Sequence, residues 1–412
     1  MKRITSVALA AAMSMVAVSG ASAETLKIAF IDPLSGPFGP SGQAGLNEWI
    51  YAAEQMNANG GINGNEVEVI GYDNKINPKE SLVQLQKALD SGVRYIAQGN
   101  GSSVASALID AINKHNKRNP GEEVLFLNYA AVDPSFTNDR CSFWHFRFDA
   151  DADMKMEAVT NWVKDQPDIK SVYIIGQDYS FGKAVAAAAV KNLTEKRPDI
   201  EIVGNELHPL GKVKDFTPYV QKIISSGADA VITGNWGADM VLLIKAATDS
   251  GFDGPILTYY GGSKGAATAM GEAAVGQVKA IVENNTNLPM SDAQAAYVDG
   301  YEAKYTEDNY YYHRIHNAMN MLSMAAEKAG SIDPMGVAFA LEGMEYDSPN
   351  GVVTMRADNH QILQPMFMST FSDDVERGVE KLPLGWKSGD ADRIEAEDTR
   401  TETTCKMKRP KT

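Results

Sequence analysis

Cysteine is scarce in this sequence of 412 residues, with Cys141 and Cys405 as the only two. In an oxidising compartment, a chain with only two cysteines is expected to form one disulfide, which would here fasten the C-terminal tail to the body of the protein. Two free thiols are the alternative interpretation. We predict the disulfide.

Basic residues are also in deficit, with 38 Lys and Arg against 53 Asp and Glu and a formal net charge of −15. A surface of this sign repels nucleic acid and anionic membranes, so neither is expected as a partner. After residue 23, no stretch approaches the roughly 18 consecutive apolar residues that a membrane-spanning helix needs. The mature chain is therefore expected to be soluble.

Motifs that place catalytic or metal-binding side chains together are missing. There is no G-x-S-x-G elbow, no G-x-x-x-x-G-K-[ST] loop and no G-x-G-x-x-G at the start of a helix. The acidic run "DADAD" (149–153) lacks the Gly and Glu of a calcium loop, so we interpret it as charge at a helix N-terminus. His313 and His316 have no further ligand beside them and are interpreted as a partly exposed polar face. We predict no enzyme activity, no cofactor and no metal.

The first 23 residues have the pattern of a secretory signal peptide. Lys2 and Arg3 precede an apolar run over residues 7–18, and the segment ends in Ala21, Ser22 and Ala23. The chain is therefore predicted to be exported, with Glu24 as its first mature residue. No cysteine follows the cleavage site, which argues against a lipid-anchored form.

From residue 24 onward, short apolar segments alternate with amphipathic ones. Segments 26–31, 66–73 and 123–130 read as buried strands separated by helices, and the same rhythm restarts near residue 150. This alternation predicts an α/β fold with two doubly wound lobes. The segment 297–330 reads as helical with no strand beside it, so it must pack on an earlier lobe.

One turn between a strand and a helix, "AQGNGSSVAS" (97–106), has the composition of an anion site. Gly101, Ser102 and Ser103 stand where the first free N–H groups of a helix would point at a negative charge. A phosphate cradle would add a Lys after the glycines, and none follows here. A tight turn with Ser as the helix cap is the alternative interpretation.

Several motifs occur in the order typical of one family. They are Ser35-Gly36-Pro37, the "GGINGN" run that ends at Asn65, "DYSFGK" (178–183) and "KDFTPYVQKIISSGADAVI" (214–232). Together they resemble the branched-chain amino acid type of periplasmic solute-binding protein, over essentially the whole mature chain. The resemblance implies the type I periplasmic-binding-protein fold, in which two lobes are joined by three hinge crossings. We expect these crossings near Phe148, Asn285 and Gly351.

The resemblance also implies how the chain is divided. Residues 1–23 are the signal peptide, 24–147 plus 286–350 the N-terminal lobe, 148–285 plus 351–375 the C-terminal lobe, and 376–412 a C-terminal tail. It further implies a periplasmic location and a function as the substrate-binding component of an ABC importer. The expected partners are a small carboxylate ligand and the permease subunits in the inner membrane, and a monomer is expected.

In that family the turn at Gly101, Ser102 and Ser103 holds the ligand's carboxylate. The resemblance and the positions after strands together predict the ligand-binding residues Gly101, Ser102, Ser103, Tyr129, Ala130, Ala131, Phe181, Trp236 and Tyr260. The family's ammonium-binding Thr and Glu are not matched, because Ala131 and Val132 stand at the first place and Tyr260 and Gly261 at the second. The ligand is therefore left open between a branched-chain amino acid and a related amino, aromatic or keto acid. An exported sensing protein and an exported hydrolase are the alternatives.

Overall fold

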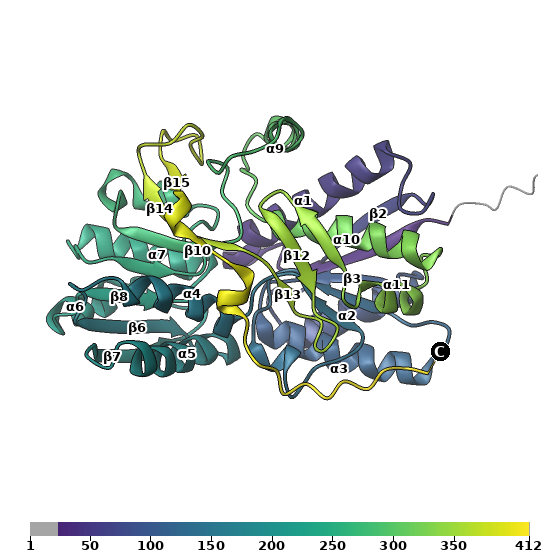
Figure 1. Ribbon diagram of the computed structural model, residues 1–412, viewed down its shortest axis with the longest axis horizontal. Helices are drawn as coiled ribbons and strands as arrows, with labels where there is room; N and C mark the ends of the chain where they lie inside the picture. The colour runs from purple at the N-terminus through teal and green to yellow at the C-terminus, as the bar shows by residue number, and fades with distance from the viewer. Residues whose placement is uncertain (1–23, 412) are drawn as a thin grey trace, which may run out of the picture.

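The computed structural model describes residues 24–411, so the predicted signal peptide lies outside the described residues. The chain forms two α/β lobes side by side, each built on its own sheet (Figure 1). Within residues 24–411, none of the helices combines the length and the apolar composition that a membrane crossing requires.

The first lobe is built on a sheet of five parallel strands in the order β2-β1-β3-β4-β5. The strands are β1 (Leu26–Asp32), β2 (Val67–Asp73), β3 (Tyr95–Gln98), β4 (Leu125–Asn128) and β5 (His145–Arg147), and the connecting helices are α1 (Gly39–Ala58), α2 (Pro78–Asp90) and α3 (Ser102–Arg118). Every residue of β3 and β4 is buried, because helices cover both faces of a parallel sheet.

The second lobe repeats this winding in β6 to β10 and then adds antiparallel strands. The parallel strands are β6 (Ser171–Gln177), β7 (Glu201–His208), β8 (Ala230–Thr233), β9 (Ile256–Thr258) and β10 (Val278–Val282), and the added ones are β14 (Met366–Ser372), β15 (Gly385–Lys387) and β16 (Arg393–Ile394). The helices are α4 (Ala152–Lys164), α5 (Ser180–Lys196), α6 (Thr217–Ser225), α7 (Gly237–Asp249) and α8 (Ala266–Met270). The expectation of a plain tail from residue 376 was therefore wrong for β15, because Trp386 of this strand and Leu384 just before it join the core of this lobe.

The helical segment predicted over 297–330 is two helices, α9 (Asp292–Lys304) and α10 (His313–Ala329), followed by α11 (Pro334–Leu341). The break between α9 and α10 is held by the buried Glu48, whose carboxylate accepts the backbone N–H groups of Tyr311 (2.8 Å) and Tyr312 (3.0 Å). As expected, α10 packs on the first lobe, where Met319 and Leu322 join the core with Trp49.

The two histidines at the start of α10 are less exposed than predicted. His313 is buried, and its ring stacks on that of His316 with centroids 5.5 Å apart. Tyr297 of α9 packs edge-on against His316, with centroids 4.9 Å apart. These imidazoles therefore belong to an aromatic cluster between α9 and α10, and not to a polar face. Nowhere in residues 24–411 do three His, Cys, Asp or Glu side chains gather into a group that would hold a metal ion.

Core packing indicates where the chain passes between lobes. The first passage follows β5 and the second follows β10, close to the expected Phe148 and Asn285. The strands β11 (Glu345–Ser348), β12 (Gly351–Met355) and β13 (Ile362–Leu363) form a small antiparallel sheet. Val353 and Met355 join the core of the first lobe, whereas Met366 and Met368 join that of the second. We therefore assign the third passage to the link between β13 and β14, later than Gly351.

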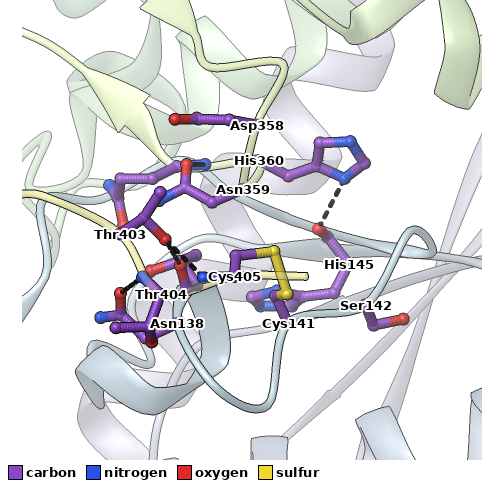
Figure 2. The surroundings of a disulfide bond; sticks show 12 residues. Asn138, Cys141, Ser142, His145, Asp358, Asn359, His360, Thr403, Thr404 and Cys405 are labelled. Atoms are coloured by element: carbon purple, nitrogen blue, oxygen red, sulfur yellow. Dashed lines mark hydrogen bonds between the residues drawn. A yellow bond between two sulfur atoms is a disulfide. The ribbon is translucent and has the colours of Figure 1, made fainter. Parts of the chain in front are cut away.

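The C-terminal segment makes a fourth connection between the lobes. After β16 in the second lobe, the chain runs back along the first lobe to its end, as the yellow trace in Figure 1 shows. There the Thr403 hydroxyl donates to the Thr137 carbonyl (2.7 Å), and the Thr404 N–H donates to the Asn138 side chain (3.1 Å). The predicted disulfide between Cys141 and Cys405 closes this connection (Figure 2).

Candidate functional site

The candidate site lies where the carboxyl ends of the parallel strands in the two sheets face each other. In both sheets the chain order reverses beside the first strand, at β1/β3 and at β6/β8, and open α/β sheets bind ligands at such points. A cavity of about 30 Å³ lies there between the lobes. It is lined by Ser41, Gly99, Asn100, Gly101, Ser102, Ala130, Val132, Tyr179, Phe181, Trp236, Tyr260, Ser263, Tyr312 and Arg314.

The N-terminus of α3 opens into this cavity. Gly101 is the residue before the helix, with a φ of 94° that favours glycine, and no side chain caps the helix. The backbone N–H groups of Ser102 and Ser103 therefore point out of the helix without a side-chain acceptor, and the helix dipole adds positive potential at the same place. This arrangement suits one negatively charged oxygen group.

A buried carboxyl group holds the turn before α3 in place. Asp32, at the end of β1, accepts the N–H of Asn100 (3.0 Å), the side-chain amide of Asn100 (2.9 Å) and the hydroxyl of Tyr129 (2.5 Å). Burial raises the pKa of Asp32 to about 7, although these hydrogen bonds act to lower it. Asp32 lies behind the cavity wall and fixes the residues that form it.

Aromatic rings form most of the opposite wall. Tyr179, Phe181, Trp236 and Tyr260 come from the second lobe, at loops that follow strands or begin helices. The indole N–H of Trp236 donates to the Tyr179 hydroxyl (2.8 Å). With Tyr312 of the first lobe, these rings give the cleft a flat, apolar lining that suits a ring or a branched aliphatic chain.

A cluster of buried charges lies at the hinge beside the cavity. The Arg314 guanidinium pairs with Glu283 (2.7 Å) and approaches Asp149 (3.7 Å), and Lys155 pairs with the other oxygen of Asp149 (2.8 Å). Burial raises the pKa of Glu283, but Arg314 and Lys155 outweigh this and leave it below its usual value. The two acids and two bases compensate one another, and Arg314 is the member that lines the cavity.

Six of the nine predicted ligand-binding residues line the cavity: Gly101, Ser102, Ala130, Phe181, Trp236 and Tyr260. Three do not. Tyr129 lies behind the wall beside Asp32, Ser103 is in the first turn of α3, and the Ala131 carbonyl accepts the Asn128 side chain (2.8 Å). Contact of any of these residues with a ligand stays a prediction.

Sequence reasoning missed several lining residues. Asn100 lies within the turn 97–106 and Tyr179 within the motif 178–183, so their position after a strand was a usable signal. Arg314 had no local signal, because its partners Asp149 and Glu283 are distant in the sequence and meet it only in the fold. Ser41, Gly99, Val132, Ser263 and Tyr312 were also not predicted.

Comparison with known proteins gives consistent results. The family model described as periplasmic binding protein matches residues 25–376. The Leu/Ile/Val-binding protein homolog 4 of Brucella abortus is 33% identical over 97% of both chains. A solved structure of a leucine-, isoleucine-, valine-, threonine- and alanine-binding protein from Brucella ovis, in a closed conformation, is 30% identical with a TM-score of 0.84, covering 94% of this chain and 100% of that one.

A more distant solved structure shares the fold alone. It is a solute-binding protein of an ABC transporter from R. palustris in complex with 4-hydroxybenzoate, 21% identical with a TM-score of 0.76, covering 90% of this chain and 97% of that one. The fold expected from the sequence is confirmed by these likenesses. The chain therefore belongs to the periplasmic binding protein family, as a solute-binding protein of the branched-chain amino acid type and not an enzyme.

Proposed function

We propose that this protein is the periplasmic solute-binding component of an ABC importer and that it captures a small carboxylate between its lobes. The observation that carries the proposal is the uncapped N-terminus of α3, which opens into the cavity between the lobes. Amide N–H groups that already point at the cleft bind a carboxylate without reorganisation. The aromatic wall of the second lobe would then close on the body of the ligand.

Capture in this protein requires movement of the lobes. Residues of both lobes, among them Ser102 and Trp236, line the same cavity, so a ligand reaches it when the lobes are further apart and touches both walls when they close. Contacts made by both lobes to one ligand favour the closed form, and the closed form is then the one that a permease recognises. The names of the Brucella relatives give leucine, isoleucine and valine among the bound molecules, which supports a small molecule with a carboxylate group as the cargo.

Calorimetry on the purified mature chain tests the carboxylate site. The ligands are leucine, phenylalanine, 4-methylpentanoate, 3-phenylpropanoate and benzoate, each with the methyl ester that removes its negative charge. We expect at least one acid to bind and its ester to bind tenfold or more weakly. An ester that binds as tightly as its acid would contradict the proposal.

Two glycine variants test the position of the carboxylate. Gly101→Ala places a side chain at a φ of 94° beside the uncapped N-terminus of α3. Gly92→Ala makes the same kind of change at a φ of 79° in a turn outside the cleft. Gly101→Ala should weaken binding and Gly92→Ala should not. In cells that lack the native chain, uptake of the labelled acid should return with the parental chain or Gly92→Ala and stay low with Gly101→Ala.

A further inference from the structure

We propose that the cleft selects carboxylates that lack an α-ammonium group, and that Arg314 is the residue that sets this selection. The inference rests on the proposed function, because it concerns the ligand of the same cleft. It goes further because it predicts different affinities for an amino acid and for the carboxylic acid of the same shape that lacks the amino group.

The lining of the cleft contains a cation and no anion. Among the described residues that line the cavity, none is an Asp or a Glu, and Arg314 is the one with a charged side chain. An ammonium group enclosed in the closed cleft would therefore lose its hydration without meeting a carboxylate. It would also share a small cavity with the Arg314 guanidinium, which repels it.

The two acids nearest to Arg314 are already engaged. Asp149 is fully buried, with one oxygen paired to Lys155 (2.8 Å) and the other accepting the Tyr260 hydroxyl (3.3 Å). Glu283 is buried and paired with Arg314 (2.7 Å). Neither carboxylate lines the cavity, so binding an ammonium would require one of these buried pairs to break.

Two further acids lie close to the cleft, but both face the protein interior. Asp32 accepts hydrogen bonds from Asn100 and Tyr129 behind the first-lobe wall. Glu48 accepts the backbone N–H groups of Tyr311 and Tyr312 in the break before α10. Both carboxylates accept hydrogen bonds that hold the backbone in place, and neither residue lines the cavity.

The same geometry favours the negative end of a ligand. The uncapped N-terminus of α3 presents positive potential to the cavity. Arg314 adds N–H donors to the lining, whereas Glu283 and Asp149, which compensate its charge, are not among the lining residues. The five aromatic rings around the cavity offer contacts to an apolar body. Two of them already face a cation of the protein, because the Arg314 guanidinium lies 4.9 Å from the Tyr312 ring centroid and the Lys155 ammonium lies 5.2 Å from that of Tyr260. A fatty, aryl or keto acid satisfies this lining, whereas a zwitterion leaves its ammonium group unmatched.

The experiment compares two pairs of ligands by calorimetry on the parental chain. 4-Methylpentanoate differs from leucine, and 3-phenylpropanoate from phenylalanine, only by the missing amino group. We expect the deaminated member of at least one pair to bind tenfold or more tightly than its amino acid. If an acid binds but neither pair shows this preference for the deaminated member, the selection is overturned while the carboxylate site stands. If no acid binds, the proposed function falls together with this inference.

A variant assigns the selection to Arg314. Arg314→Met removes the cation and leaves Glu283 without its partner beside the cleft, so the affinity ratio of deaminated to amino ligand should fall at least fivefold. Arg377→Met, which removes a cation paired with Asp299 at the surface, is the control and should leave the ratio unchanged. A purely structural role would weaken both ligands equally, and an unchanged ratio in Arg314→Met would overturn the assignment. Circular dichroism reports whether the variant folds, and if it does not, Arg314→Gln takes its place with the same expected and overturning ratios.

Discussion

The ring of Phe38 packs against the indole of Trp236 across the cleft, with centroids 4.3 Å apart. Phe38 comes from the loop before α1 in the first lobe, and Trp236 from the residue before α7 in the second. Two glycines of the second lobe make room for the Phe38 ring. A Cβ at Gly211 or at Gly237 would lie only 2.7 Å from an atom of that ring. The second lobe thus leaves room for an aromatic side chain of the first lobe when the lobes are closed.

We predict that Trp236→Ala weakens ligand binding tenfold or more, equivalent to about 1.4 kcal/mol for each factor of ten. The indole both lines the cavity and contacts Phe38, so its loss removes ligand contacts and part of the closed interface. Isothermal calorimetry with the best acid measures the change. The matched control is Trp162→Ala on α4, where the indole lies outside the cavity. Equal affinity of Trp236→Ala and the parental chain would remove Trp236 from the site.

A second contact between lobes joins Lys264, in the loop after β9, to Asp308, in the break between α9 and α10. The Asp308 side chain is only 5% exposed, and it accepts from Asn47 of the first lobe (2.7 Å) as well as from Lys264, so Lys264 is its partner from the second lobe. We expect Lys264→Met to weaken ligand binding twofold to tenfold, because only the closed form loses the ion pair. Lys245→Met, which removes a cation paired with Asp249 within α7, is the control and should bind as the parental chain does.

The repeated alternation of short apolar and amphipathic segments was sufficient to predict the two lobes, since buried parallel strands appear in a sequence as short apolar runs. The break before Tyr311 was not predictable, because it depends on Glu48 from a helix far away in the chain. Arg314 was missed for the same reason. A residue whose function comes from partners on other elements leaves no local pattern, whereas the turn at Gly101 does.

The disulfide offers a prediction about lobe opening. It fixes the segment after β16, which leaves the second lobe, to the first lobe at Cys141 (Figure 2). The double variant Cys141→Ser/Cys405→Ser should lose about 2–4 kcal/mol of stability, the range typical of a disulfide. It should also open further without ligand, seen as a larger radius of gyration in X-ray scattering. A melting temperature equal to that of the oxidised parental chain, measured without reductant, would contradict this role.

The last prediction concerns Asp32 and pH. Burial raises its pKa from 3.8 to about 7, so between about pH 4 and 7 the folded state holds a proton that the unfolded state has lost. The contribution of Asp32 to stability therefore decreases as pH rises through this window, by about 1.4 kcal/mol per pH unit. His313 and His316 act in the opposite direction, because burial lowers their pKa values. Their contribution to the stability of the protein therefore decreases as pH falls below about 6.5. The slope of the parental chain alone would mix these effects.

Comparison with Asp32→Asn isolates the carboxyl group, since the histidines are common to both proteins. In urea unfolding, the variant should gain about 2–3 kcal/mol relative to the parental chain between pH 5 and pH 8, because it has no proton to lose. Asp73→Asn is the matched control: hydrogen bonds from Ser35 and Leu34 outweigh burial and lower the pKa of Asp73, so its carboxylate stays ionised from pH 5 to 8. Its stability relative to the parental chain should not change across that range. Parallel curves for Asp32→Asn and the parental chain would mean that the buried carboxyl stays ionised beside Asn100 and Tyr129.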